Sequence, residues 1–159
     1  MQVYFVRHGK AEPLQAGIDD RERPLSPEGV RQVKRLAIVW AWMQLEVHRI
    51  LSSPYLRARQ TAEIIAEVLQ VPVDIVPSLS PHCSLADVAE LTYAYRGEPS
   101  LMVVGHQPAL GQIVQALTGG LVEVKPGTMV GVESGSFRPG RGLLIGLYDP
   151  ELMENLAEH

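Results

Sequence analysis

Cysteine is almost absent from this chain: Cys83 is the only one among 159 residues. No internal disulfide can form, which favours a reducing compartment. Long hydrophobic runs are also missing, so no segment is predicted to span a membrane. The first residues do not show the charged start and apolar stretch of a secretion signal, and we therefore expect a cytoplasmic location.

Excess positive charge is missing as well. Lys and Arg number 14 against 18 Asp and Glu, which gives a net charge of −4 at pH 7. This balance argues against a general nucleic-acid binder, and any functional positive charge must be local, as in a pocket for one anionic group. The length fits a single domain over residues 1–159, which can bury roughly 70% of its unfolded surface without a structural metal.

Short apolar runs alternate along the chain with longer segments of helical periodicity. Strands are predicted over residues 3–6, 50–52, 71–75, 101–104, 129–132 and 143–148, and helices over 27–47, 54–69, 85–97 and 108–117. This alternation predicts an α/β fold with a mostly parallel central sheet and helices on both faces. The acidic end, residues 151–159, is expected to pack weakly or fray.

Three of the predicted strands lead into side chains that can bind an anion. The first runs into Arg7 and His8, the fourth into His106, and Arg57 lies in the first turn of the helix after the second. Ligands of such sheets bind beyond the carboxyl ends of the strands, so these groups meet if the strands are neighbours. Because arginine forks match phosphoryl oxygens, the pattern predicts a phosphoryl pocket.

His8 is the candidate nucleophile of this pocket. A neutral imidazole has a lone pair that can attack phosphorus and give a covalent intermediate. Nearby arginines disfavour the imidazolium and should keep His8 neutral near pH 7. Gly9 leaves the backbone close by, so its carbonyl could hold the other ring nitrogen as N–H. Arg23 could contact substrate at the mouth of the pocket, and a solvated loop arginine is an equal alternative.

Four segments, in this order, resemble the signature of the histidine phosphatase superfamily, which includes the phosphoglycerate mutases. They are residues 7–9 (Arg-His-Gly), 24–29 (Pro-Leu-Ser-Pro-Glu-Gly), 52–61 (Ser-Ser-Pro-Tyr-Leu-Arg-Ala-Arg-Gln-Thr) and 104–106 (Val-Gly-His). The resemblance implies that His8 is phosphorylated, that Arg7 and Arg57 bind the phosphoryl oxygens, and that His106 donates a hydrogen bond to the same group. It implies no metal or other cofactor, and a minimal phosphoglycerate mutase-like fold without lid insertions.

The mutase-like members carry an acidic residue after the third strand as general acid. Here residues 78–83 read Ser-Leu-Ser-Pro-His-Cys, without a carboxylate. The short length, the missing acid and the segment Arg23-Pro24-Leu25 are similar to the SixA-type phosphohistidine phosphatases. An imidazole leaving group is far less basic than an alkoxide, so a site that cleaves phosphohistidine can work without its own acid.

Three functions remain open from the sequence. The first is a phosphatase of phosphohistidine on a protein, such as a histidine-phosphotransfer domain or a phosphocarrier, with phosphate as product. The second is a phosphatase of small esters such as sugar phosphates, with Asp87 or Glu90 of the third predicted helix as acid. The third is an inactive phosphate-binding or scaffold module, which ranks last because all four pocket residues are present.

Overall fold

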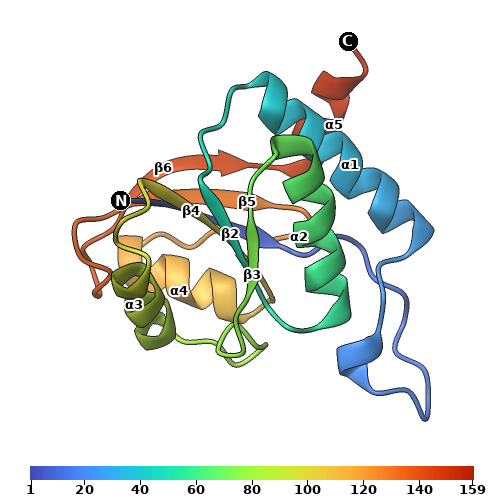
Figure 1. Ribbon diagram of the computed structural model, residues 1–159, viewed down its shortest axis with the longest axis horizontal. Coiled ribbons are helices and arrows are strands. Elements are labelled where there is room, and N and C mark those ends of the chain that lie inside the picture. The colour runs from blue at the N-terminus through green and yellow to red at the C-terminus, as the bar shows by residue number, and fades with distance from the viewer.

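The computed structural model describes residues 1–159 and contains a six-stranded sheet in the order β3-β2-β4-β1-β5-β6 (Figure 1). The strands are β1 (Gln2–Arg7), β2 (Arg49–Ser52), β3 (Val73–Ile75), β4 (Ser100–Gly105), β5 (Met129–Glu133) and β6 (Leu143–Tyr148). Neighbouring strands among β1 to β4 pair in parallel, whereas β5 pairs antiparallel with β1, and β6 with β5. The predicted α/β fold with a mostly parallel sheet is confirmed.

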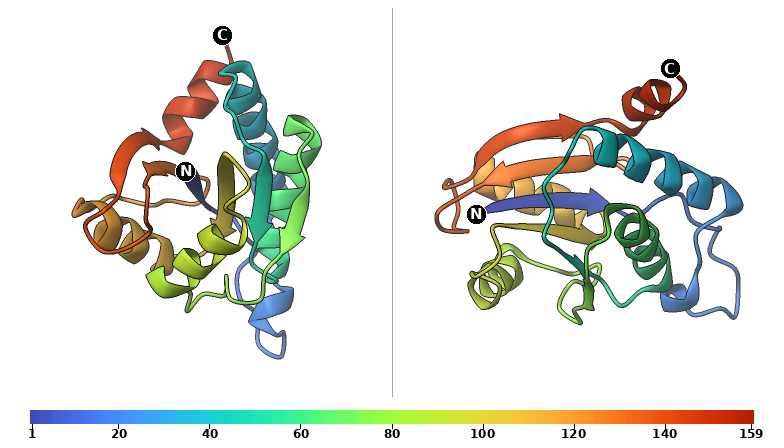
Figure 2. Two further views of the ribbon diagram at one scale, coloured as in Figure 1. Left: turned by 60° about the vertical axis from the view of Figure 1, so that its left-hand side comes forward. Right: turned by 45° about the horizontal axis from the view of Figure 1, so that its top comes forward.

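Helices cover both faces of the sheet (Figure 2). One face carries α1 (Pro27–Trp42), α2 (Leu56–Leu69) and α5 (Pro150–Ala157), and the other carries α3 (Leu85–Ala94) and α4 (Ala109–Thr118). A short 3-10 helix, η1 (Asp20–Glu22), lies in the connection between β1 and α1. No helix is both long and apolar enough to cross a membrane.

The core consists of two apolar clusters, one on each face. Side chains alternate between the faces along a strand. In β1, Val3 and Phe5 join the cluster under α3 and α4, while Tyr4 and Val6 join the cluster under α1 and α2. Burial on both faces explains why this strand is a continuous apolar run.

Three helix boundaries differ from the prediction by two residues or more, and one of them is the end of α3, which lies at Ala94 rather than at residue 97. Ser26 caps α1 as predicted, but the helix ends at Trp42 rather than at residue 47. The reason is Gln44, whose left-handed φ of 57° turns the chain out of the helix. The second helix begins at Leu56 rather than at residue 54, because Tyr55 has extended backbone angles.

Of the two outcomes expected for the acidic end, weak packing is observed, since Pro150 is the only buried residue of α5, and fraying over residues 151–157 is not. Residues 150–157 form α5, whose first turn is capped by the Asp149 carboxylate. Met153 packs against the apolar cluster under α1, and the Glu154 carboxylate lies 3.6 Å from the guanidinium of Arg35, a residue of α1. One apolar contact and one ion pair therefore attach a short helix whose leucines, Leu152 and Leu156, remain exposed.

Candidate active site

The three strands that carry the predicted residues are neighbours, in the order β2-β4-β1. Arg7, the last residue of β1, pairs with Gly105, the last residue of β4. Beyond the strands, the His8 amide donates to the Gly105 carbonyl at 3.1 Å, and the Ser53 amide donates to the Val104 carbonyl at 3.0 Å. The polar residues therefore meet at the carboxyl edge of the sheet, as predicted.

The His8 ring is fixed at both nitrogens. Nδ1 lies 2.8 Å from the Gly9 carbonyl oxygen, and Arg57 Nε donates to Nε2 at 3.3 Å. A carbonyl oxygen can only accept, so Nδ1 carries the proton and Nε2 carries the lone pair. His8 is 7% exposed, so its unprotonated Nε2 lies in a nearly buried position.

The charge state of His8 follows from its surroundings. Burial, the largest cause, and the charges of Arg57, Arg7 and Arg23 together lower its pKa to about 4, against the opposing hydrogen bond to Gly9. The imidazole is therefore neutral at pH 7, in agreement with the sequence analysis. Burial contributes more than the arginines to which the sequence analysis attributed the effect.

Gly9 is required by close packing against α1. A Cβ at this position would lie 2.5 Å from Val33 Cγ2, closer than real contacts allow. The Gly9 amide donates to Thr61 Oγ1 at 3.1 Å, and that hydroxyl donates to the Arg57 carbonyl at 2.8 Å. Thr61 thus links the segment that orients His8 to the first turn of α2, which carries Arg57.

Arg57 is buried, with 4% exposure, while Arg59 two residues later is exposed. Besides the contact with His8, Arg57 donates from Nη1 to the Asp20 carbonyl at 2.7 Å and from Nη2 to Asp20 Oδ2 at 3.1 Å. The Tyr55 ring centroid lies 5.1 Å from its guanidinium carbon. Arg57, the predicted residue, and not Arg59 therefore points into the site.

His106 lies beside His8, with the two ring centroids 5.3 Å apart. Its Nε2 is 2.7 Å from Ser53 Oγ, which accepts a hydrogen bond from the Tyr55 amide at 3.2 Å. That hydroxyl can donate its own proton to Nε2, and in the tautomer that this bond selects His106 carries its proton on Nδ1. Burial, and then the charge of His8, lower the pKa of His106 to about 3, so this ring is neutral at pH 7.

Two buried nitrogen atoms of the site have no hydrogen-bond partner in the protein. They are His106 Nδ1 and Arg7 Nε. Arg7 is held by one bond only, from Nη1 to the Val124 carbonyl at 2.9 Å. Buried donors are normally paired, so both atoms indicate a place for an acceptor group of a ligand.

These side chains surround one open cavity of about 510 Å³. Arg23 also lines the cavity, so the structure brings together the side chains of all the predicted site residues. Gly9 does not line the cavity and contributes its backbone carbonyl to the His8 ring. The cavity is lined by Arg7, His8, Lys10, Ala11, Asp20, Arg23, Arg57, Pro81, His106, Gln107 and Pro126. Within the described chain, no three His, Cys, Asp or Glu side chains lie close enough together to hold a metal ion.

Asp20 is the main residue that sequence reasoning missed. Its carboxylate accepts from Arg23 Nε at 2.9 Å and from Arg57 Nη2 at 3.1 Å. Burial raises its pKa, but the hydrogen bond from Arg23 and the charge of Arg57 outweigh burial, so the pKa lies below the usual value. The residue begins the short helix η1 in the connection between β1 and α1, where the sequence has no periodicity and nothing local marks it as part of the site.

Asp87 and Glu90, the acids considered for ester cleavage, do not line the cavity. Asp87 caps α3 by accepting from the Ser84 amide and hydroxyl at 2.8 and 2.7 Å, and Glu90 is exposed. Cys83 is buried, and burial raises the pKa of its thiol to about 11, as expected of an apolar filler.

Comparison with known proteins identifies the family. The sequence model of the histidine phosphatase superfamily (branch 1) matches residues 3–82. Phosphohistidine phosphatase SixA of Escherichia coli is 34% identical to the chain over 124 residues, which cover 76% of each protein. The chain belongs to the histidine phosphatase superfamily. A solved structure of the protein histidine phosphatase SixA complexed with tungstate matches with a TM-score of 0.86 and 28% identity over 96% of this chain and 99% of that one.

Membership of the histidine phosphatase superfamily and the SixA relatives support phosphatase activity for the chain. The superfamily also includes relatives with other substrates. The adenosylcobalamin/alpha-ribazole phosphatase of Salmonella typhimurium is 34% identical over 82 residues, which cover 50% of this chain and 40% of that protein. The family match alone therefore leaves the substrate class open.

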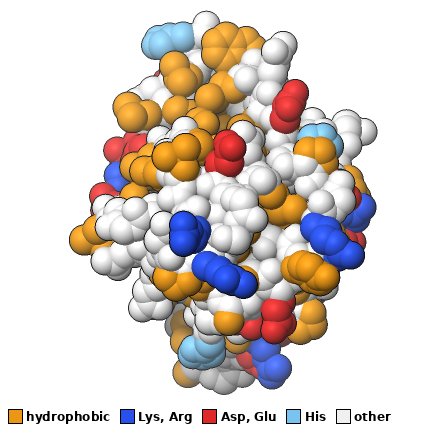
Figure 3. All heavy atoms as spheres, turned by 90° about the vertical axis from the view of Figure 1, so that its left-hand side faces the viewer, with side chains coloured by type: hydrophobic (Ala, Val, Ile, Leu, Met, Phe, Trp, Pro, Cys, Tyr) orange, Lys and Arg blue, Asp and Glu red, His pale blue; other side chains and the backbone are white.

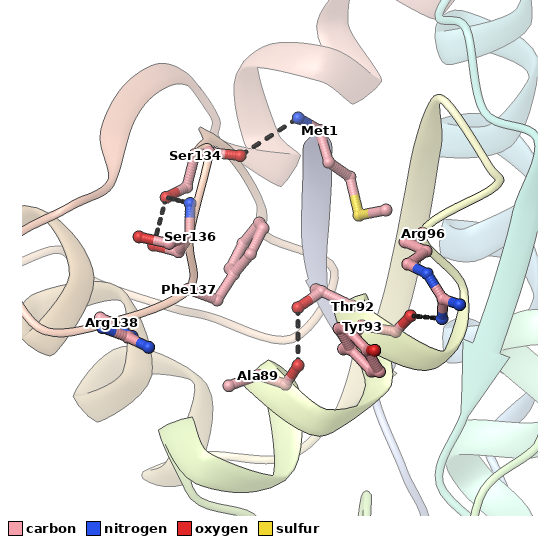
Figure 4. A pocket seen from close by; sticks show the side chains of 10 residues that line it. Met1, Ala89, Thr92, Tyr93, Arg96, Ser134, Ser136, Phe137 and Arg138 are labelled. Atoms are coloured by element: carbon pink, nitrogen blue, oxygen red, sulfur yellow. Dashed lines mark hydrogen bonds between the residues drawn. The ribbon is translucent and has the colours of Figure 1, made fainter.

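A second cavity, of about 520 Å³, lies at the opposite end of the sheet (Figure 4). It is bounded by Met1 at the start of β1, by Tyr93 and Arg96 near the end of α3, and by Phe137 and Arg138 of the loop after β5. On the face that includes the N-terminal side of the molecule, charged side chains of both signs are scattered among hydrophobic ones (Figure 3). None of the predicted site residues lines this cavity.

Proposed function

We propose that this protein is a phosphohistidine phosphatase that works through a covalent phosphohistidine intermediate on His8. The observation that carries the proposal is the His8 ring, which is neutral, protonated on Nδ1 by its contact with Gly9, and held with Nε2 toward an arginine-rich cavity. A nucleophile with an unprotonated nitrogen beside fixed positive charge is what attack on a phosphoryl anion requires.

In the first step, Nε2 of His8 forms a bond to phosphorus while the bond from phosphorus to the leaving nitrogen breaks. The electron pair of that bond stays on the leaving imidazole, which takes a proton from solvent or is already protonated. Arg57 and Arg7 bind the phosphoryl oxygens, and Gly9 stabilises the positive charge that spreads over the His8 ring.

In the second step, water attacks phosphorus and the bond to His8 breaks. One proton of the water passes to solvent or to the phosphate, and His8 returns to its neutral form. His106 donates from Nδ1 to a phosphoryl oxygen in both steps. This role is supported by the buried, unpartnered Nδ1 and by Ser53, which holds the opposite nitrogen.

The substrate follows from the leaving group. No carboxylate lies in residues 78–83, and neither Asp87 nor Glu90 lines the cavity. Asp20, the carboxylate that does line it, is paired with two arginines and has a lowered pKa, which makes it a poor proton donor. We therefore propose a phosphohistidine side chain of a protein as substrate, such as a histidine-phosphotransfer domain or phosphocarrier. The open cavity admits such a side chain.

The second candidate is a phosphatase of small phosphate esters. It is favoured by the likeness to the adenosylcobalamin/alpha-ribazole phosphatase of Salmonella typhimurium over half of this chain. This function requires a proton donor for the alkoxide, and Asp87 or Glu90 would have to reach the cavity through a movement of α3.

A comparison of kcat/KM on a phosphohistidine protein and on sugar and serine phosphates tests the proposal. Without an acid, an alkoxide should leave more slowly by about 10²-fold or more, so phosphohistidine should be the better substrate. Asp87→Asn and Glu90→Gln should leave the phosphohistidine rate unchanged. A faster rate on a sugar phosphate, removed by one of these substitutions, would establish the second candidate instead.

A further inference from the structure

The Asp20 carboxylate lies on the candidate phosphoryl site and is bound by two of its arginines. It accepts from Arg23 at 2.9 Å and from Arg57 at 3.1 Å. Arg57 uses each of its guanidinium nitrogens for an internal contact: Nε to His8, and Nη1 and Nη2 to the Asp20 carbonyl and carboxylate. Three of its five N–H groups are engaged in this way, so a phosphoryl group that binds two of these nitrogens at once competes with Asp20 at one of them or more.

Carboxylate and phosphoryl oxygens compete for arginine because both are anionic acceptors that a guanidinium can bind through two parallel hydrogen bonds. The Asp20 carboxylate lines the cavity, so it also repels a phosphoryl anion that enters. A carboxylate that is already on the arginines therefore weakens the binding of any second anion, by the strength of its own ion pairs and by this repulsion.

We propose that Asp20 is an affinity-setting residue of the site, an internal anion that occupies Arg57 and Arg23 and is displaced by the phosphoryl group. This inference rests on the proposed function, since it assumes that the cavity receives phosphoryl groups. Its consequence is weak retention of free phosphate, the product, whereas a phosphorylated protein gains further contacts outside the cavity.

The fold allows this displacement. The Asp20 side chain is 39% exposed, and η1 contains no buried residue, so the carboxylate can turn toward solvent. The segment stays attached when it does, because Arg57 Nη1 also donates to the Asp20 backbone carbonyl at 2.7 Å. A substitution of the side chain therefore removes the competing charge without releasing η1 from α2.

Asp19 is a matched control. It is the neighbouring carboxylate, caps the same 3-10 helix, and pairs with exposed Arg21 at 2.8 Å rather than with a residue of the cavity. Asp19→Asn changes the net charge of the protein by the same amount as Asp20→Asn. Any difference between the two variants therefore comes from the contacts of Asp20 and not from the overall field.

Titration calorimetry with inorganic phosphate on the purified full chain tests the inference. We expect Asp20→Asn to lower the Kd for phosphate by roughly three- to tenfold, and Asp20→Ser to change it in the same direction. Asp19→Asn should leave the Kd within about twofold of the wild type, as expected for an exposed pair. The inhibition constant of phosphate in the phosphatase assay should fall in parallel for the Asp20 variants.

Weaker phosphate binding in both Asp20 variants would overturn the inference and make Asp20 a positioning residue for the arginines. Equal tightening by Asp19→Asn would also overturn it, since the effect would then be long-range charge. If the Arg57→Ala variant binds phosphate with the same Kd as the wild type, the cavity is not the phosphoryl site and the proposed function fails with it. Tightening by Asp20→Asn without hydrolysis of phosphohistidine would overturn the proposed substrate and leave the role of Asp20 intact.

Discussion

The two cavities at opposite ends of the sheet have nearly the same volume, about 510 and 520 Å³, and each is lined by arginines. They differ in how the side chains are held. In the first, Arg57 is buried and bonded through every guanidinium nitrogen. In the second, Arg96 and Arg138 are exposed, and Arg96 stacks over the exposed ring of Tyr93, 4.5 Å from its centroid.

The difference shows that volume and the presence of arginines do not by themselves distinguish the candidate active site from the other cavity. The first cavity lies where parallel strands end, so that residues distant in sequence converge with fixed orientations and in a poorly solvated place. The second is formed by the start of β1, the end of α3 and a loop, and the exposed guanidinium of Arg138 within it has no hydrogen bond or ion pair, since this residue bonds only through its backbone. Only the first offers preorganised groups to a phosphoryl anion.

The largest expected effect is the loss of the nucleophile. His8→Ala should lower turnover by at least about 10³-fold, because no other side chain of the cavity has an unprotonated nitrogen in its place. A brief reaction with radiolabelled substrate, followed by an alkaline quench, should trap acid-labile phosphate on His8 in the wild type. Tyr93→Ala, in the opposite cavity, serves as control and should keep full activity. Label on Cys83, or on no residue, would disprove the assignment.

The next effect concerns the arginine fork. Arg57→Lys should lower kcat/KM by about 10²-fold, because a lysine keeps the charge but cannot hold two phosphoryl oxygens in one plane. Arg59→Lys is the matched control two residues along the same helix, where the side chain is exposed. Steady-state kinetics on both variants measure the difference. Equal and small effects would mean that neither arginine contacts the substrate.

A smaller effect is expected on stability against pH. Burial and neighbouring charge lower the pKa of His8 to about 4 and that of His106 to about 3 in the folded protein. In the unfolded chain both rings titrate near 6.5, so above that pH they are neutral in both states and contribute no difference. As the pH falls from about 6.5 toward 4, only the unfolded state gains these protons, and the free energy of unfolding decreases.

Urea unfolding at a series of pH values measures this decrease. The double variant His8→Gln, His106→Gln should show a shallower loss of stability between about pH 6.5 and 4 than the wild type. The same slope in both proteins would show that the two buried rings are protonated in the folded state as readily as in the unfolded chain.

The smallest effect is expected from chelators. The cavity draws its positive charge from arginines, and we predict that a saturating concentration of EDTA leaves the phosphatase rate unchanged. Arg138→Ala, in the opposite cavity, should likewise have no effect on this rate. A loss of activity in EDTA that magnesium restores would show that the phosphoryl site depends on a metal.

The sequence by itself determined the alternation of strands and helices, the arginine and histidine residues at the strand ends, and the family. Val3 to Val6 form a continuous apolar run, as expected of a strand that is buried on both faces. Arg7 and His8 follow this run directly, so they could be placed at the carboxyl edge of the sheet, where ligands bind. Gly9 was identifiable for a similar local reason, since the ring of His8, the preceding residue, needs a carbonyl close by to hold one of its nitrogens. These features depend on residues near one another in the chain.

The tertiary structure alone decided the role of residues whose partners are remote. Asp20 enters the site because η1 folds back over Arg57, 37 positions further along the chain, and Ser53 meets His106 across 53 positions. The docking of α5 on α1 depends likewise on Glu154 and Met153 finding a distant helix. Such contacts are set by the packing of whole elements, and no periodicity or spacing in the sequence records them.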